Sequence, residues 1–299
     1  MKEKVLIFGG SGLVGSRLTE LHGQKFDIKS PDMDQVNILK EDQVLEILKD
    51  FAPDVVINFA AFTDVQGAEE QKGDKDGLCY KLNVVGAKNV AKACQSYKTH
   101  LIHISTDYVF DGVKAVAPYV EEDTPNPHNW YGQTKYEGEE EVIESGCSSI
   151  IVRISMPFSS HFDLKQDIAR IFLSQLRDGK EIFAITDQKI TPVLVDDVAN
   201  ALYALIQKGS EGIYHVVSTT WTTPFDFATL IAKSFNLDQA LIKSTTLDEY
   251  NREKQAKILR YSWLDPAKFI GEFGDDILHS TEESIEIFKN QQLDRFNRS

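Results

Sequence analysis

The feature that most constrains the fold is the run VLIFGGSGLVG near the N-terminus, from Val5 to Gly15. It joins a short apolar run to a glycine-rich turn and then to an amphipathic stretch, which is typical of a buried strand leading into a helix. Its glycines Gly9, Gly12 and Gly15 fit GxxGxxG. The first glycine of such a turn permits the tight bend, the second lets the backbone approach a pyrophosphate, and the third allows close helix–strand packing. The pattern predicts a dinucleotide site at the start of the helix, although an isolated match can also be an ordinary glycine turn.

The first half of the chain alternates short apolar runs with amphipathic stretches, which indicates a parallel sheet covered by helices. Right-handed crossovers between such strands make this an α/β, doubly wound, Rossmann-like fold. The expected strands are Val5–Phe8, Asp27–Lys29, Val55–Asn58, Leu101–Ser105, Ile150–Ile154 and Gly212–Val217. The expected helices are Asp42–Phe51, Asn83–Tyr97, Ile168–Arg177 and Val195–Gly209.

The chain is long enough, at 299 residues, for one or two domains with a large core. The strand and helix pattern loosens after Ile154, and no linker or repeat marks a boundary. We expect a nucleotide-binding domain over residues 1–155, to which the chain returns near residues 181–218. A smaller substrate-binding lobe is expected over 156–180 and 219–299.

Charge and cysteine usage exclude several classes of protein. The 32 basic against 46 acidic side chains give a net charge of −14, so nucleic acid is not an expected partner. The cysteines Cys79, Cys94 and Cys147 have no metal-ligand spacing and are expected to be reduced, as in a cytoplasmic protein. The apolar run after Lys4 breaks at Gly9, so neither a signal peptide nor a membrane helix is expected.

A tyrosine and a lysine that are candidates for catalysis occur in the run YGQTK, where Tyr131 precedes Lys135 by four residues. Residues with this spacing share one face of a helix. An ammonium beside a phenol stabilises its ionised form, so the pair predicts a phenol whose pKa is lowered and that can serve as a proton donor. Tyrosine and lysine also occur at this spacing on helices by chance.

Six runs together resemble the extended short-chain dehydrogenase/reductases across nearly the whole chain: GGSGLVG, INFAAFTDV, LNVVGAKNV, STDYVFDG, YGQTK and ITPVLVDDVANAL. Within that family, STDYVFDG followed by YGQTKYEGE is most similar to the dTDP-4-dehydrorhamnose reductases. The same runs also resemble the regulatory beta subunit of methionine adenosyltransferase, a non-catalytic relative with the same nucleotide-binding frame.

The resemblance implies an NADPH or NADH cofactor and residues that hold it. The family often has an acidic residue where Asn37 stands, but an asparagine can also donate and accept there. Lys135 is expected to hold the nicotinamide ribose and Asn83 to lie on the central helix. The other implied cofactor residues are Gly9, Ser11, Gly12, Leu13, Val14 and Gly15 at the diphosphate, Ile38 beside Asn37, and Ala60 and Ala61 along the cofactor.

The choice between the two coenzymes depends on the residues after the second strand. NAD-preferring folds place an acidic residue there for the ribose hydroxyls. This chain has Lys29 and Ser30, which favour a 2′-phosphate and hence NADPH. Alternatively, Lys29 is only a solvated charge, and Asp32 or Asp34 meets the ribose.

The chemistry implied is reduction of a carbonyl group. Hydride transfer leaves negative charge on the carbonyl oxygen, so the site needs a proton donor and a second hydrogen-bond partner for that oxygen. Tyr131 is assigned as the acid, Lys135 as the residue that lowers its pKa, and Thr106 as the second oxygen ligand. Thr106 could instead simply end a strand.

The resemblance also implies substrate contacts, and here the sequence departs from the reductase pattern. Met156 stands where those enzymes usually have a tryptophan, Gln66 stands where they tend to have an acidic residue, and the usual Arg-Pro pair is missing near Arg260. Asp107 is expected either at the edge of the sugar pocket or as a helix or turn cap. The implied substrate-binding residues are Thr63, Asp107, Tyr108, Met156 and Arg260, with Arg260 able to hold a diphosphate.

Three functions remain open. The first is an NADPH-dependent reductase of a nucleotide-linked keto sugar, with a homodimer plausible. The second is an NADP-binding regulatory subunit, and the third is an epimerase or dehydratase of the same family. The glutamates Glu137, Glu139, Glu140 and Glu141 are expected on a solvated helix face rather than at a metal, and His103 in the core.

Overall fold

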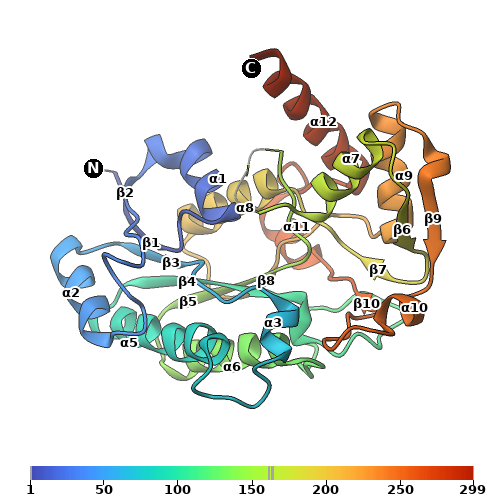
Figure 1. The fold of residues 1–299 in the computed structure, drawn as a ribbon. Coiled ribbons are helices and arrows are strands. Elements are labelled where there is room, and N and C mark those ends of the chain that lie inside the picture. The colour runs from blue at the N-terminus through green and yellow to red at the C-terminus, as the bar shows by residue number, and fades with distance from the viewer. Residues whose placement is uncertain (1, 161, 163–164, 299) are drawn as a thin grey trace.

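A six-stranded parallel sheet, with strand order β2-β1-β3-β4-β5-β8, forms the centre of the fold (Figure 1). The structure is a computed structural model and describes residues 2–160, 162 and 165–298. The strand order reverses direction between β1 and β3, and ligands of doubly wound sheets bind beyond the carboxyl ends of the strands at such a point. The strands are β1 (Lys4–Phe8), β2 (Asp27–Lys29), β3 (Val55–Asn58), β4 (His100–Thr106), β5 (Ser149–Ile154) and β8 (Gly212–His215).

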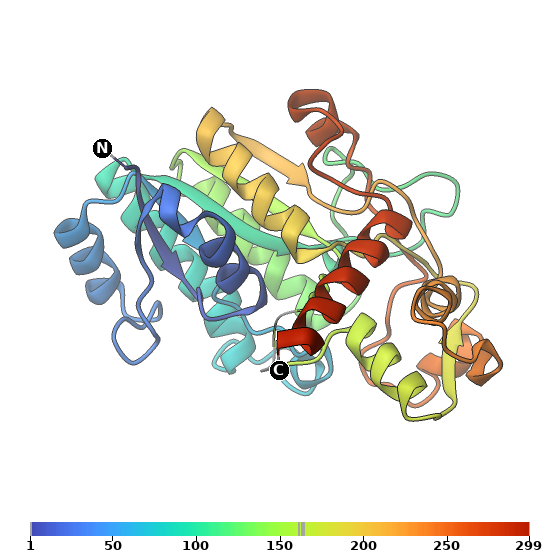
Figure 2. The same cartoon turned by 90° about the horizontal axis from the view of Figure 1, so that it is seen from above.

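Helices cover both faces of the sheet (Figures 1 and 2). One face carries α1 (Leu13–His22), α8 (Val195–Lys208) and α11 (Ala267–Phe273). The opposite face carries α2 (Glu41–Phe51), α5 (Ala87–Tyr97) and α6 (Trp130–Glu144). The short helices α3 (Val65–Glu69) and α4 (Leu78–Tyr80) lie between β3 and α5 in the sequence, and residues Lys81–Gly86 form a π-helix that continues into α5.

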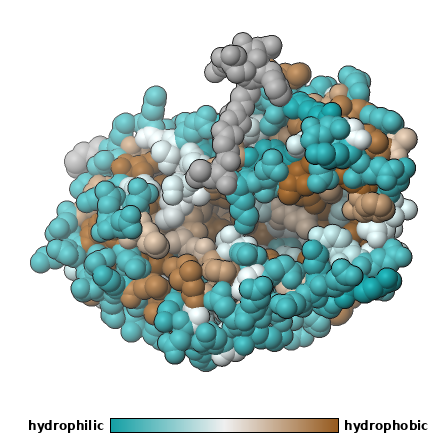
Figure 3. Space-filling model, viewed as in Figure 1, coloured by the Kyte–Doolittle hydropathy of each residue, from teal (hydrophilic) through white to brown (hydrophobic). Residues whose placement is uncertain are grey.

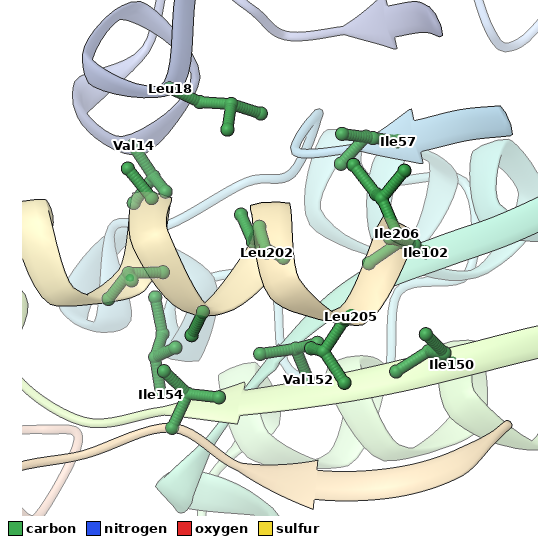
Figure 4. Packing of buried hydrophobic residues seen from close by; sticks show 14 of the residues in the cluster. Val14, Leu18, Ile57, Ile102, Ile150, Val152, Ile154, Leu202, Leu205 and Ile206 are labelled. Carbon is green, nitrogen blue, oxygen red and sulfur yellow. The ribbon is translucent and has the colours of Figure 1, made fainter. Parts of the chain in front are cut away.

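The largest hydrophobic core lies between the sheet and α8, where the side chains of α8 meet those of β4 and β5 (Figure 4). Leu202 and Leu205 of α8 are fully buried against Ile102, Ile150 and Val152 of the sheet. The apolar positions of α8 recur at helical spacing, so one face of the helix can cover the sheet continuously. This packing places the carboxyl ends of β1, β3 and β4 at one edge of a rigid layer.

A smaller lobe has its own core, in which Phe158, Phe227 and Phe288 pack edge to face. Its strands form the parallel pairs β6 (Ile182–Ile185) with β9 (Ile242–Thr245) and β7 (Lys189–Ile190) with β10 (Tyr261–Ser262). Its helices are α7 (Ile168–Arg177), α9 (Pro224–Ser234), α10 (Leu247–Asn251) and α12 (Thr281–Arg298). Figure 2 shows α12 running between the sheet and the lobe.

The expected fold class is confirmed, and each expected strand and helix is present with small shifts at its ends. The structure differs from the predicted domain ranges in two details. The return to the nucleotide-binding part begins with α8 at Val195 rather than near residue 181, because β6 pairs with β9 in the lobe. In addition, Phe269 of α11 packs against the sheet core although it lies in the range 219–299. The division into two domains otherwise stays a proposal.

Two further expectations concern membranes and cysteines. Among the described helices, none combines the length and apolarity that a bilayer span requires. Cys79 and Cys94 are buried and Cys147 is half-buried, and all of them are unpaired.

Candidate active site

The glycine turn lies where the strand order reverses, between the ends of β1 and β3. Gly9 has φ +73°, a backbone conformation that favours glycine. A methyl group at Gly9 would lie 2.7 Å from the amide nitrogen of Ala60 at the end of β3, and one at Gly15 would lie 2.7 Å from the Cα atom of Gly10. The turn is therefore too tight for side chains at Gly9 and Gly15, as the motif predicted.

The start of α1 fits a cofactor diphosphate. Gly12 is the N-cap residue, no side chain caps this helix end, and its first turn carries no acidic residue. The first amide groups of a helix lack backbone partners and carry partial positive charge, so an uncapped end that opens at a glycine turn suits an anion. Ser11 is exposed at this turn, while Leu13 and Val14 begin the helix.

The end of β2 brings only one of its two predicted cofactor residues to the glycine turn. Ser30 lies directly against Gly10, so closely that a methyl group at Gly10 would overlap with its hydroxyl. The Lys29 ammonium lies 5.6 Å from the centre of the Phe51 ring at the end of α2. An open cavity of about 530 Å³ adjoins both residues, and its other lining residues include Gln35, Gln43, Glu46 and Asp50.

The predicted adenine residues lie in the turn before α2. The Asn37 side chain accepts a hydrogen bond from the Leu39 amide at 2.9 Å, so it stabilises this turn. The Ile38 carbonyl accepts from Asn89 of α5 at 2.9 Å. Asp32 and Asp34 are exposed in the preceding loop.

The three predicted catalytic residues lie at the carboxyl end of β4 and the first turns of α6. Thr106 ends β4, while Tyr131 and Lys135 lie on α6, and their exposed fractions are 6%, 9% and 2%. The Lys135 ammonium donates to the carbonyl oxygen of Ile104 at 2.6 Å. A methyl group at Gly132 would overlap with the carbonyl oxygen of Tyr108, so glycine here lets α6 approach the end of β4.

The acid–base properties of this pair differ from the expectation. Burial raises the pKa of Tyr131 above its usual value, although a hydrogen bond with Thr106 opposes the shift. Burial also lowers the pKa of Lys135 to about 8, while the charge of Glu139 opposes that shift. The expected lowering of the Tyr131 pKa is therefore wrong for this structure, in which Tyr131 is protonated at neutral pH and available as an acid.

Asp107 is buried, with an exposed fraction of 2%, and its place at a sugar pocket stays a prediction. Its carboxylate accepts hydrogen bonds from Thr106 Oγ1 at 2.9 Å and from Ser155 Oγ at 3.0 Å. Burial raises the pKa of Asp107 to about 6. The N-cap of the following 3₁₀ turn is Thr106 rather than Asp107, because the Thr106 hydroxyl accepts from the Tyr108 amide. The half-buried ring of Tyr108 meets the Tyr131 ring edge-on, with centroids 5.7 Å apart.

Asn83 connects α6 to the loop between β3 and α3, called the cofactor loop below because it contains Ala60 and Ala61. The sequence did not indicate this role. Its side-chain oxygen accepts from the Phe62 amide at 2.8 Å, and its amide nitrogen donates to Thr134 Oγ1 at 3.0 Å. Thr134 Oγ1 in turn donates to the carbonyl oxygen of Tyr131 at 3.0 Å. Asn83 belongs to the π-helix, an irregularity that is frequent at functional sites and that local sequence patterns do not reveal.

The structure does not bring the remaining predicted substrate residues, Thr63, Met156 and Arg260, into contact with one another through any described hydrogen bond or ion pair. Figure 3 shows one face of the molecule hollowed, with apolar residues in the hollow and polar residues around it. Thr63 is exposed after β3, where Lys165 donates to its hydroxyl at 3.5 Å. Met156 is half-buried with φ +41°, a strained conformation of a kind that clusters at functional sites. Arg260 forms ion pairs with Asp187 and Asp248, so its role at a diphosphate stays a prediction.

The expectation of a solvated glutamate face is wrong for Glu139, whose side chain is 1% exposed and pairs with the equally buried Arg153. Glu141 pairs with Lys88, and no group of three or more potential metal ligands occurs in the described part of the chain. His103 is a core residue, since it is 1% exposed and burial holds the pKa of its ring well below the usual value.

The fold defines a class of protein: the chain has the doubly wound fold of the NAD(P)-dependent reductases of the extended short-chain dehydrogenase/reductase type. More narrowly, the chain belongs to the family described as RmlD substrate binding domain, which matches residues 2–292. The resemblance of the sequence to this group of reductases is therefore confirmed.

Three relatives illustrate the range of the family. A probable low-salt glycan biosynthesis reductase of Haloferax volcanii is 31% identical over 281 residues, which cover 90% of this chain and 91% of that protein. The methionine adenosyltransferase 2 subunit beta of Bos taurus is 31% identical over 257 residues, covering 81% of this chain and 75% of that one. The crystal structure of dTDP-4-dehydrorhamnose reductase from Bacillus anthracis in complex with NADP has a TM-score of 0.87 at 31% identity, covering 96% of this chain and 99% of that chain.

Proposed function

We propose that this protein uses NADPH to reduce the keto group of a nucleotide-linked 4-keto-6-deoxy sugar. The observation that carries the proposal is the placement of Thr106, Tyr131 and Lys135 together at the end of β4, at the same edge of the sheet as the glycine turn. Relatives named as reductases, and a related dTDP-4-dehydrorhamnose reductase that binds NADP, support both the reaction and the substrate class.

The bound cofactor would supply a hydride to the carbonyl carbon of the sugar. Tyr131 would donate its proton to the carbonyl oxygen as negative charge develops there. The Lys135 ammonium favours the phenolate that remains and can hold the nicotinamide ribose. Because the three side chains are at most 9% exposed, water is largely excluded and these interactions act in a low dielectric.

Thr106 acts in this scheme as the second partner of the carbonyl oxygen. Its hydroxyl donates to Asp107 in the structure, so it must exchange that acceptor for the substrate oxygen. Asp107 and Ser155 then serve to hold Thr106 in place rather than to contact the sugar. Tyr108, Thr63 and Met156 remain the proposed substrate contacts, together with Arg260.

Ser30 supports the choice of NADPH, because it lies against the glycine turn and carries no negative charge toward a 2′-phosphate. Lys29 supports this choice less than Ser30 does, because its ammonium lies over the Phe51 ring. We also propose a homodimer, which light scattering of the purified protein tests.

The test measures oxidation of NADPH and NADH in parallel with a dTDP-linked 4-keto-6-deoxyhexose. We expect turnover with preference for NADPH, and a large loss of turnover in Thr106→Val. A protein that binds NADPH tightly but turns over no nucleotide-linked keto sugar would instead be a regulatory subunit. The similarity to methionine adenosyltransferase 2 subunit beta favours that second candidate, and a pull-down for a partner enzyme would test it.

A further inference from the structure

We propose that Gln66 is a positioning residue that latches the segment 251–259 across the candidate active site. This segment, called the strap below, connects α10 to β10 and therefore belongs to the lobe in sequence. Gln66 belongs to α3, which follows the cofactor loop at the end of β3. The two residues that meet, Gln66 and Ala256, are 190 positions apart in the chain.

The Gln66 side chain binds both polar groups of one strap residue. Its Nε2 donates to the carbonyl oxygen of Ala256 at 2.8 Å, and its Oε1 accepts from the Ala256 amide at 3.2 Å. Ala256 is fully buried, whereas Arg252 to Gln255 are exposed. The carboxamide thus holds the strap at the point where it turns into the molecule.

The next three strap residues are held in the same way by carboxamide side chains. Asn129, the N-cap residue of α6, donates to the Lys257 carbonyl at 3.4 Å. Asn251 binds both the amide and the carbonyl of Ile258 at 3.0 and 3.1 Å. Gln188 donates to the Leu259 carbonyl at 2.7 Å.

These four contacts differ in which part of the molecule supplies them. Gln188 directly precedes β7 of the lobe, and Asn251 ends α10 and is itself the first strap residue, so their bonds keep the strap in shape. Gln66 and Asn129 belong to the nucleotide-binding part, so their hydrogen bonds attach the strap to that part of the molecule. Figure 1 shows α3 on the side of the sheet that faces α10 and β10.

The residue that precedes the strap lies near Tyr108. Tyr250, which directly precedes the strap, is close enough to Tyr108 to be among the groups that raise the pKa of its hydroxyl. Tyr108 in turn contacts the Tyr131 ring. Tyr131 is 9% exposed and Tyr250 is 41% exposed.

In this proposal the strap acts as a movable cover. It would move away to admit a nucleotide sugar to Tyr131 and would exclude water again on its return. A segment that is attached by a few hydrogen bonds needs less free energy to open than a packed helix does. The consequence for turnover rests on the proposed function, but the latch itself does not.

The chemistry of the latch depends on a neutral amide. A glutamate at position 66 keeps the size and can still accept from the Ala256 amide, but it loses the donor and turns a negative oxygen toward the Ala256 carbonyl. Glu replacement should therefore release the strap without leaving a cavity. Methionine keeps the length of the side chain and removes both hydrogen bonds.

The experiment compares the full-length wild type with Gln66→Glu, Gln66→Met and the control Gln175→Glu, which makes the same charge change at an exposed position of α7. Native trypsin cleavage after Arg252, Lys254 and Lys257 is followed by mass spectrometry. We expect both Gln66 variants to be cleaved in the strap about five- to tenfold faster than the wild type, and the control to match the wild type. Strap cleavage at the wild-type rate in both Gln66 variants would overturn the proposal.

A kinetic measurement separates positioning from mere stability. We expect Gln66→Glu to lower kcat/KM for the keto sugar several-fold while leaving the Kd for NADPH unchanged. An unchanged kcat/KM despite faster strap cleavage would overturn the role of the latch in the reaction. If the wild type turns over no keto sugar, the proposed function fails, whereas the proteolysis result still decides whether Gln66 latches the strap.

Discussion

Arg153 of β5 and Glu139 of α6 form an ion pair with two hydrogen bonds, at 3.0 Å and 2.7 Å, in which both side chains are 1% exposed. Glu139 lies one helical turn after Lys135, and the Arg153 guanidinium also lies 5.1 Å from the centre of the Phe110 ring. The pair thus fixes the helix that carries Tyr131 and Lys135 against the sheet. A buried charge without its partner is costly, so we expect Glu139→Gln to destabilise the protein by about 3–5 kcal/mol, measured by urea unfolding.

The matched control is Glu141→Gln on the same helix. Glu141 forms its ion pair with Lys88 at 2.8 Å near the surface, where such pairs contribute less than about 1 kcal/mol. Equal losses of stability in the two variants would contradict the structural role assigned to the buried pair.

The rate should depend on the charge of Lys135. Burial lowers the pKa of Lys135 from 10.5 to about 8, so the charged form prevails below pH 8 and is lost as the pH rises through that value. We expect kcat to fall above pH about 8, and Lys135→Arg, if active, to lack this fall because arginine stays charged. A kcat that is flat from pH 7 to pH 9.5 in the wild type would refute the assignment.

The same shift has a consequence for stability. The folded protein holds the Lys135 proton less tightly than the unfolded chain, so the cost of burying this charge is fully present below pH 8 and disappears between pH 8 and 10.5. This residue alone therefore makes stability rise with pH in that window. The slope of the unfolding free energy against pH should be less positive there in Lys135→Met.

Gly138 should tolerate no side chain. A methyl group there would overlap with the carbonyl oxygen of Asn83 in the π-helix, whereas nothing lies within 4 Å of a methyl group at Gly271 of α11. We expect Gly138→Ala to lower stability by more than about 2 kcal/mol. Gly271→Ala should be neutral or stabilising by up to about 1 kcal/mol, because alanine is the better helix former. Thermal unfolding of both variants measures the difference.

The coenzyme preference should respond to Ser30. An aspartate there would repel a 2′-phosphate and could accept hydrogen bonds from the ribose hydroxyls of NADH. We expect Ser30→Asp to raise the KM for NADPH at least about tenfold relative to that for NADH. If the ratio of the KM values for NADPH and NADH stays as in the wild type, the 2′-phosphate does not bind at Ser30.

Local sequence patterns were sufficient to predict most of the fold. The bounds of β2 and β3 coincide with the predicted ones. β3 is a buried strand that begins with three apolar residues, which is the pattern that local sequence reports best, whereas only Ile28 of β2 is apolar. The spacing of Tyr131 and Lys135 placed them on one helix in the same manner. Such patterns report which face of an element is buried, but not what lies opposite.

Contacts between distant residues account for what the sequence did not reveal. The burial of Glu139 depends on Arg153 in the neighbouring strand, and that of Asp107 on Ser155, a partner 48 residues away. The raised pKa of Tyr131 follows from the burial of the whole site rather than from its spacing to Lys135. The contact between Gln66 and Ala256 joins segments that no periodicity relates.

The most direct test of the proposed function is the rate of NADPH oxidation with a dTDP-linked 4-keto-6-deoxyhexose in the wild type and in Tyr131→Phe. Phenylalanine keeps the ring that packs against Tyr108 and removes only the proton donor. We predict that kcat falls at least about 100-fold while the Kd for NADPH stays the same. Full activity of Tyr131→Phe would contradict the assignment of Tyr131 as the acid and with it the proposed reaction.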